Sequence, residues 1–194
     1  MTTTRILVLP GSARKDSLNR KLAALAADRA RHAGAEVTLI NPADYPMPIY
    51  DGDCESEQGV PEHARRLTDE LVSHDALILV CPEYNSSITP LLKNIIDWTS
   101  RPQPDRPGLV GWTGKCAALL AASPGALGGL RGLVHVRAIL SNIGVHVIPQ
   151  QFALSRAHDA FNPDGSLKDE AQAKAVDNIA AALVRTAAAL KSAS

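Results

Sequence analysis

Three segments of the chain are apolar at consecutive positions, and each is followed by a polar or glycine-rich loop. These segments cover residues 5–9, 76–81 and 116–122. Consecutive apolar residues indicate strands with both faces buried, which is typical of the centre of a parallel sheet. Two further apolar runs, at residues 36–40 and 144–149, predict two more strands.

Helical patterns alternate with these strands. Apolar residues recur at helical spacing over residues 18–33, 61–74, 91–99, 130–143 and 168–190. The segment from Asn41 to Pro61 has four prolines and little periodicity, so we expect a long loop there. The alternation of strands and helices predicts one α/β domain over residues 1–194, with helices on both faces of a doubly wound parallel sheet.

Composition and charge narrow the classes of partner. Lys and Arg total 20 and Asp and Glu total 20, so no net field attracts nucleic acid or an anionic membrane. The N-terminal residues lack a signal-peptide pattern, and no apolar run approaches the ~20 residues that span a bilayer. We therefore expect a soluble, cytoplasmic protein. Its three cysteines, Cys54, Cys81 and Cys116, lie far apart without metal-ligand spacing, so we expect neither a metal site nor a disulfide framework.

The loop after the first strand carries the candidate chemistry. It leads directly into a helix, and a helix N-terminus offers unpaired N–H groups and the positive end of the helix dipole to an anion. Hydroxyl, amide and guanidinium donors suit the oxygens of a phosphate. The candidate residues are Gly11, Ser12, Arg14, Ser17, Leu18 and Asn19. The alternative is that these residues are only helix caps and turn formers.

Two more loops are expected at the same edge of the sheet. Residues 82–87 and 123–129 each follow a buried strand, and ligands of doubly wound sheets bind outside the carboxyl ends of the strands. The first loop lacks GxGxxG, and residues 111–116 lack GxxxxGK[ST] spacing, so neither dinucleotide nor P-loop binding is indicated. A hydroxyl-rich loop with one arginine suits a terminal monophosphate. A flat ligand with one phosphorylated end describes FMN.

Several spaced motifs then resemble one family. They are Gly11-Ser12-x-Arg14-x-x-Ser17-x-Asn19, Pro82-Glu83-Tyr84-Asn85-x-Ser87, Leu92-Lys93-Asn94-x-Ile96-Asp97-Trp98-x-Ser100-Arg101, Ser123-x-Gly125-x-x-Gly128-Gly129 and His135-Val136-Arg137. In this order they resemble the NADPH-dependent FMN reductases, flavodoxin-like reductases of quinones, azo dyes and chromate. The resemblance implies a five-stranded sheet of order 2-1-3-4-5.

The resemblance also implies a site and a reaction. Non-covalent FMN would place its phosphate at Ser12, Arg14, Ser17 and Asn19. Its ring would lie between residues 82–85 and the third loop; these ring-side residues are Pro82, Glu83, Tyr84, Asn85, Ser123, Pro124 and Gly125. NAD(P)H would deliver a hydride to the flavin, and a quinone, azo dye, nitroaromatic, chromate or free flavin would then accept the electrons. No catalytic side chain is expected, because the flavin does the redox chemistry.

Assembly and specificity complete the expectations. The helix over residues 91–98 is apolar on more than one face, and the resemblance implies a homodimer or a homotetramer, with this helix in the dimer contact. A loop folded over the spare face is the alternative. Glu83 is expected to make a polar contact at the subunit boundary rather than to act as a base.

Thr89-Pro90 stands where relatives usually have Pro-Gly, which leaves the acceptor preference open. Arg101 and Arg106 are candidates for a 2′-phosphate contact, although solvated arginines are the alternative.

Two rival functions stay open. A flavodoxin-type electron carrier would bind FMN without oxidising a nicotinamide. A regulatory module on the same fold would use the flavin structurally or not at all.

Overall fold

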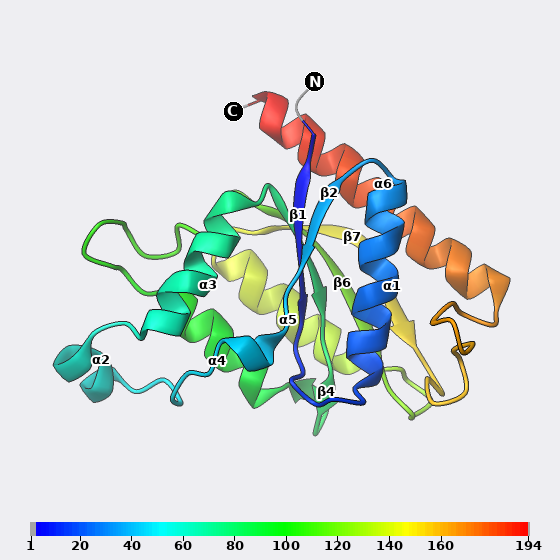
Figure 1. Ribbon diagram of the computed structural model, residues 1–194, viewed down its shortest axis with the longest axis horizontal. Coiled ribbons are helices and arrows are strands. Elements are labelled where there is room, and N and C mark those ends of the chain that lie inside the picture. Colours follow the sequence, from blue (N-terminus) through cyan, green and yellow to red (C-terminus); the bar gives the residue numbers. More distant parts are fainter. Residues whose placement is uncertain (1–2, 194) are drawn as a thin grey trace.

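A five-stranded parallel sheet lies between two layers of helices in the computed structural model, which describes residues 3–193 (Figure 1). The sheet strands are β1 (Arg5–Pro10), β2 (Glu36–Leu39), β3 (Ala76–Val80), β6 (Cys116–Ala122) and β7 (His146–Leu154). A separate hairpin joins β4 (Glu83–Tyr84) and β5 (Ser87–Ile88). The helices are α1 (Leu18–His32), α2 (Gly52–Gln58), α3 (Glu62–Ser73), α4 (Pro90–Thr99), α5 (Leu130–Asn142) and α6 (Glu170–Ala193), with a 3-10 turn, η1 (Pro42–Asp44).

The strand order is β2-β1-β3-β6-β7, and all four pairings are parallel. The predicted flavodoxin-like fold with order 2-1-3-4-5 is therefore confirmed. In the central strands, alternate side chains enter opposite cores. Ile6 and Val8 pack beneath α1 and α6, whereas Leu7 and Leu9 pack beneath α3, α4 and α5. Figure 1 shows these two helical layers on either side of the sheet.

The loop predicted between Asn41 and Pro61 contains more structure than the sequence indicates. It holds η1 and the helix α2. Residues 52–58 carry no periodic apolar face, and α2 is instead held at its start by Asp51, whose carboxylate accepts the N–H groups of Asp53 and Cys54. Because this helix is polar and is held by its cap, its sequence has no periodic hydrophobic pattern that would predict a helix.

The last strand is longer than predicted. The apolar pattern indicates an end at Pro149, but β7 continues to Leu154 after a register shift opposite Ala117 and Leu119. Within this sheet β7 pairs with β6 alone, so it is an edge strand. Proline is tolerated there because its missing N–H need not serve a second neighbour.

The functional loops lie at one edge of the sheet. The first loop, the β4–β5 hairpin and the loop between β6 and α5 all follow the carboxyl ends of their strands (Figure 1). The hairpin turns at Asn85 and Ser86, which both have positive φ, 50° and 66°. Two adjacent residues of positive φ are typical of a type I′ hairpin turn, in which Asn is favoured.

Candidate functional site

Three loops that are far apart in the sequence meet around one cavity of about 210 Å³. Its lining residues are Ser12, Arg14, Asp16, Ser17, Leu18, Asn19, Pro82, Glu83, Tyr84, Ala122, Ser123 and Pro124. Three of the predicted site residues, Gly11, Asn85 and Gly125, are not among them. Sequence reasoning missed Asp16 and Ala122, of which Ala122 is the last residue of a buried strand.

The first loop is held close to its neighbours at Gly11. Its N–H donates to the carbonyl of Val80 at 2.8 Å, and its carbonyl accepts the hydroxyl of Thr89 at 3.1 Å. A Cβ at Gly11 would lie 3.0 Å from Cδ of Pro82. Glycine at this position therefore lets the first loop pack against the second.

The start of α1 presents hydrogen-bond donors to the cavity. Ser17 is the N-cap, and its Oγ accepts the N–H of Arg20 at 3.4 Å. Ser12 Oγ accepts the N–H of Arg14 at 3.3 Å. Each hydroxyl keeps its own proton to donate, and the first N–H groups of a helix have no partner within it. Within residues 3–193, the Arg14 guanidinium makes no ion pair or hydrogen bond. This end of the cavity is therefore suited to an anion.

Asn19 lines the cavity, but its side chain already binds the end of β6. Its Nδ2 donates to the carbonyl of Ala122 at 2.8 Å, and its Oδ1 accepts the N–H of Ala122 at 2.9 Å. The residue is only 5% exposed. The amide predicted as a phosphate donor is thus largely engaged within the chain.

Glu83 anchors the β4–β5 hairpin to α5. Its Oε1 accepts two N–H groups of Arg131, at 2.7 and 3.1 Å, and its Oε2 accepts the N–H of Gly132 at 2.8 Å. Burial alone would raise the pKa of this carboxyl, but the bonds from Gly132 and Arg131 outweigh it and hold the pKa below its ordinary value. A carboxylate so engaged is a weak base. Within the chain, its polar contacts are with Arg131 and Gly132 of α5.

The other two loops also line the cavity. Tyr84 is 49% exposed and lies at the rim of the cavity beside Pro82. In the third loop, Ser123 donates its N–H to Leu154, and its carbonyl accepts the N–H of Ala157. A Cβ at Gly128 would lie 2.7 Å from the backbone of β7, so this loop packs directly on that strand.

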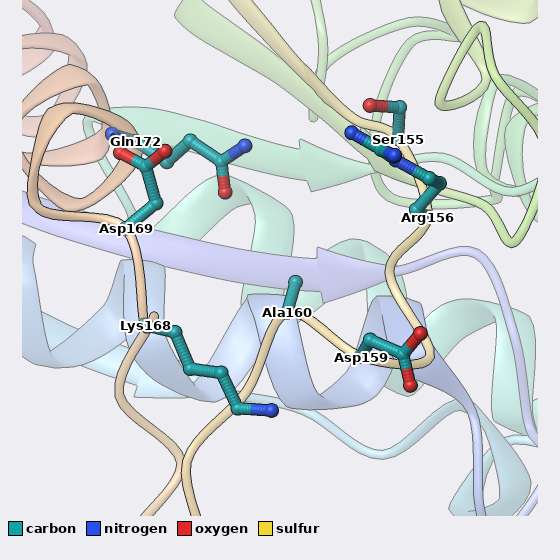
Figure 2. Close-up of a pocket in the computed structure, with 7 residues that line it drawn as sticks. All are labelled: Ser155, Arg156, Asp159, Ala160, Lys168, Asp169 and Gln172. Atoms are coloured by element: carbon teal, nitrogen blue, oxygen red, sulfur yellow. Dashed lines mark hydrogen bonds between the residues drawn. The ribbon is translucent and has the colours of Figure 1, made fainter.

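A second cavity of about 290 Å³ borders the segment after β7. Figure 2 shows Arg156 and Asp159 on the opposite side of it from Lys168 and Asp169. The charges alternate in sign, and Asp169 caps α6 by accepting the N–H groups of Ala171 and Gln172. Balanced charges give this cavity no preference for an anion or a cation.

A loop covers much of the spare face of α4. The carbonyl of Pro48 accepts hydrogen bonds from the side chains of Asn94 and Trp98, and the rings of Tyr50 and Trp98 meet edge to face at 5.0 Å. A loop folded over this face was the alternative to a subunit interface, and such a loop is present. A cavity of about 410 Å³ remains open over Leu91 and Ile49, and Ile49 is 85% exposed.

The two candidate arginines for a 2′-phosphate are engaged elsewhere. Arg101 binds both carboxylate oxygens of Glu55, at 2.8 and 2.9 Å. Arg106 binds Asp69 and Asp105. Their charges are therefore neutralised within the chain, as expected of structural arginines.

The cysteines and the other potential metal ligands form no metal centre in the part of the chain that the structure describes. Across residues 3–193, no group of three or more His, Cys, Asp or Glu side chains is placed to hold a metal ion. Burial raises the pKa of the Cys81 and Cys116 thiols, so both are inert at neutral pH. Among the helices of the same residues, none has the length and apolar character to cross a membrane.

Comparison with known proteins decides the family. The model of the NADPH-dependent FMN reductases matches residues 4–159. The chain belongs to this family. It is 36% identical to a quinone reductase of Pseudomonas putida over 85% of each chain, and 32% identical to a 2-hydroxy-1,4-benzoquinone reductase of a Burkholderia species over 84% of this chain and 83% of that protein.

A solved structure agrees with this assignment. This FMN reductase family member superposes on FerB, a flavoenzyme NAD(P)H:(acceptor) oxidoreductase of Paracoccus denitrificans, with a TM-score of 0.80. The two are 30% identical, and the match covers 96% of this chain and 98% of that one.

Proposed function

We propose that this FMN reductase family member binds FMN non-covalently and transfers electrons from NAD(P)H to quinones or similar acceptors in a ping-pong reaction. The observation that carries the proposal is the cavity at the carboxyl edge of the sheet, where the Arg14 guanidinium and the start of α1 face two further loops. The relatives named quinone reductase support the class of acceptor.

The donor set fits the phosphate end of FMN. Ser12, Arg14 and Ser17 supply two hydroxyls and a guanidinium, and α1 adds the N–H groups of Leu18 and Asn19. The cavity is smaller than the ~300–1,000 Å³ that usually encloses a whole ligand. We therefore place the ring at its open rim, between Pro82 with Tyr84 and Ser123 with Pro124.

The protein supplies binding and orientation. When bound, FMN provides the redox chemistry, as an acceptor of hydride and a donor of electrons to the second substrate. Glu83 fixes the hairpin to α5, and we propose the backbone N–H groups of residues 83–85 as the donors to the ring. Gly11, Asn85 and Gly125 act through the backbone, by close packing and by turn geometry. No side chain is assigned as a catalytic acid, base or nucleophile.

The reaction is tested with the purified protein, FMN, NADPH or NADH, and a benzoquinone. Oxidation of the nicotinamide well above a free-flavin blank is expected. Flavin retention without nicotinamide oxidation would instead identify an electron carrier, and a protein that does not retain FMN on a desalting column would favour a regulatory module.

The cradle itself is tested with Arg14→Ala. Loss of a charge-assisted contact to the phosphate is expected to weaken FMN by roughly 1.5–3 kcal/mol, or about 10- to 150-fold in Kd. Lys15→Ala is the matched control, because this neighbour carries the same charge but lines a different cavity. Its FMN affinity is expected to stay within about twofold of the wild type. Equal affinities of the two variants would refute the assignment.

We further propose a cytoplasmic homodimer through the α4 face, or a tetramer of two such dimers. The open apolar surface over Leu91 and Ile49 supports the dimer. The three free cysteines support a reducing compartment. Sedimentation equilibrium measures the assembly, and a monomer at micromolar concentration would contradict it.

A further inference from the structure

At the end of β6, the backbone hydrogen bonds on one side are made by a side chain and not by a neighbouring strand. Ser123 donates its N–H toward β7, so the N–H and C=O of the preceding residue, Ala122, point to the opposite side. On that side the neighbouring strand β3 has already ended at Val80. The carboxamide of Asn19 fills this place and satisfies both groups of Ala122.

The carboxamide therefore acts as a substitute peptide unit. Like a backbone peptide, it offers one acceptor and one donor to the neighbour, and its bonds, at 2.8 and 2.9 Å, have the lengths of sheet hydrogen bonds. Both residues are buried, and 103 positions separate them in the sequence. Burial makes this contact costly to lose, because both backbone groups of Ala122 would be left without partners.

The contact joins the two ends of the candidate flavin cavity. Asn19 is the second residue of α1, two positions after the N-cap Ser17 on the phosphate side. Ala122 directly precedes Ser123 and Pro124 on the ring side. Of the two hydrogens on Nδ2, one is used by Ala122, and Oδ1 is an acceptor that repels a phosphate.

From this geometry, and resting on the proposed function, we propose that Asn19 is a positioning residue. Its side chain sets the distance between the phosphate loop and the ring-side loop through its two hydrogen bonds to Ala122. Asn19 therefore affects flavin binding through Ala122.

The test compares two flavins that differ only in the phosphate. Kd values of FMN and of riboflavin are measured for the wild type, Asn19→Gln, Asn19→Ala and Arg14→Ala. Gln keeps a carboxamide but displaces it from Ala122 by one methylene group and adds no charge beside the phosphate, so it is the milder change if the Ala variant does not fold. Far-UV circular dichroism and urea unfolding define conditions in which each variant is fully folded.

For a positioning residue, both Asn19 variants weaken FMN and riboflavin by the same factor, on the order of tenfold. Arg14→Ala serves as the contrast, because it is expected to weaken FMN alone. Selective loss of FMN binding in the Asn19 variants would overturn the inference, since it would make Asn19 a phosphate ligand. Unchanged affinity for both flavins in a folded but less stable variant would also overturn it. If the wild type binds neither flavin, the proposed function fails and the inference falls with it.

Discussion

The hydroxyl of Thr89 connects the first loop to α4, and its removal should destabilise the protein. The side chain is 3% exposed. The hydroxyl donates to the carbonyl of Gly11 at 3.1 Å and accepts the N–H of Leu92 at 3.4 Å as the N-cap of α4. Thr89→Val keeps the shape of the side chain and removes both bonds. It is therefore a direct measure of what the hydroxyl contributes.

The expected loss follows from these two bonds. An N-cap contributes about 0.5–2 kcal/mol, and a buried carbonyl left without its donor costs about 1–3 kcal/mol. Because the two bonds share one hydroxyl, we expect a combined destabilisation of roughly 2–4 kcal/mol. In a chain of this size, each kcal/mol lowers Tm by about 2–4 °C, which gives a fall of roughly 4–16 °C.

Urea unfolding at neutral pH measures the change, with Thr89→Ser as the matched control. Ser keeps the hydroxyl and removes a methyl group, so its expected cost is only about 1 kcal/mol. A Val variant as stable as the Ser variant would show that the hydroxyl does not stabilise the protein.

Two further predictions concern buried or partly buried ion pairs. The pKa of Glu83 lies below its ordinary value in the folded chain, so its carboxylate contributes stability above the unfolded pKa and loses it as pH falls through the folded pKa. Glu83→Gln should therefore destabilise the protein at pH 7 by about 1–3 kcal/mol, and in urea titrations the difference from the wild type should shrink as the pH falls below 4.5, the ordinary pKa of this carboxyl. A difference that stays constant with pH would contradict this reasoning. Arg101→Ala removes the partner of Glu55, and faster amide hydrogen exchange is expected in α2. Arg106→Ala, whose partners Asp69 and Asp105 lie outside α2, should leave that exchange unchanged; equal effects of the two variants would refute the role of Arg101.

Most of the fold could be predicted because its central strands are buried on both faces. The continuous apolar runs at residues 76–80 and 116–122 leave few alternatives to a parallel sheet, and the caps at Ser17 and Thr89 locate the starts of α1 and α4. The helix α2 could not be predicted in the same way. It is held by the Asp51 cap and by the hydrogen bonds that Arg101, a residue 46 positions away, donates to Glu55.

The cavity could be predicted in outline for a related reason. Parallel strands end at the same edge of a sheet, so loops with suitable chemistry after β1, β3 and β6 must lie near one another. The sequence does not show which polar groups are free to bind a ligand in the cavity and which form hydrogen bonds to other parts of the chain. Asn19 and Glu83 both have side chains of a kind that binds ligands, yet their hydrogen-bond partners in the fold are Ala122 and Arg131.

Three long-range contacts therefore fix the three loops before any ligand is considered. Thr89 binds Gly11, Asn19 binds Ala122, and Glu83 binds the start of α5. Each is a side-chain bond to the backbone, so each constrains the path of a loop and not only the position of one group. A site held in this way loses little conformational entropy when a ligand binds, which leaves more of the interaction energy for affinity. The polar residues around this cavity thus divide into those that hold its shape and those, such as Arg14, whose side-chain donors have no partner within residues 3–193.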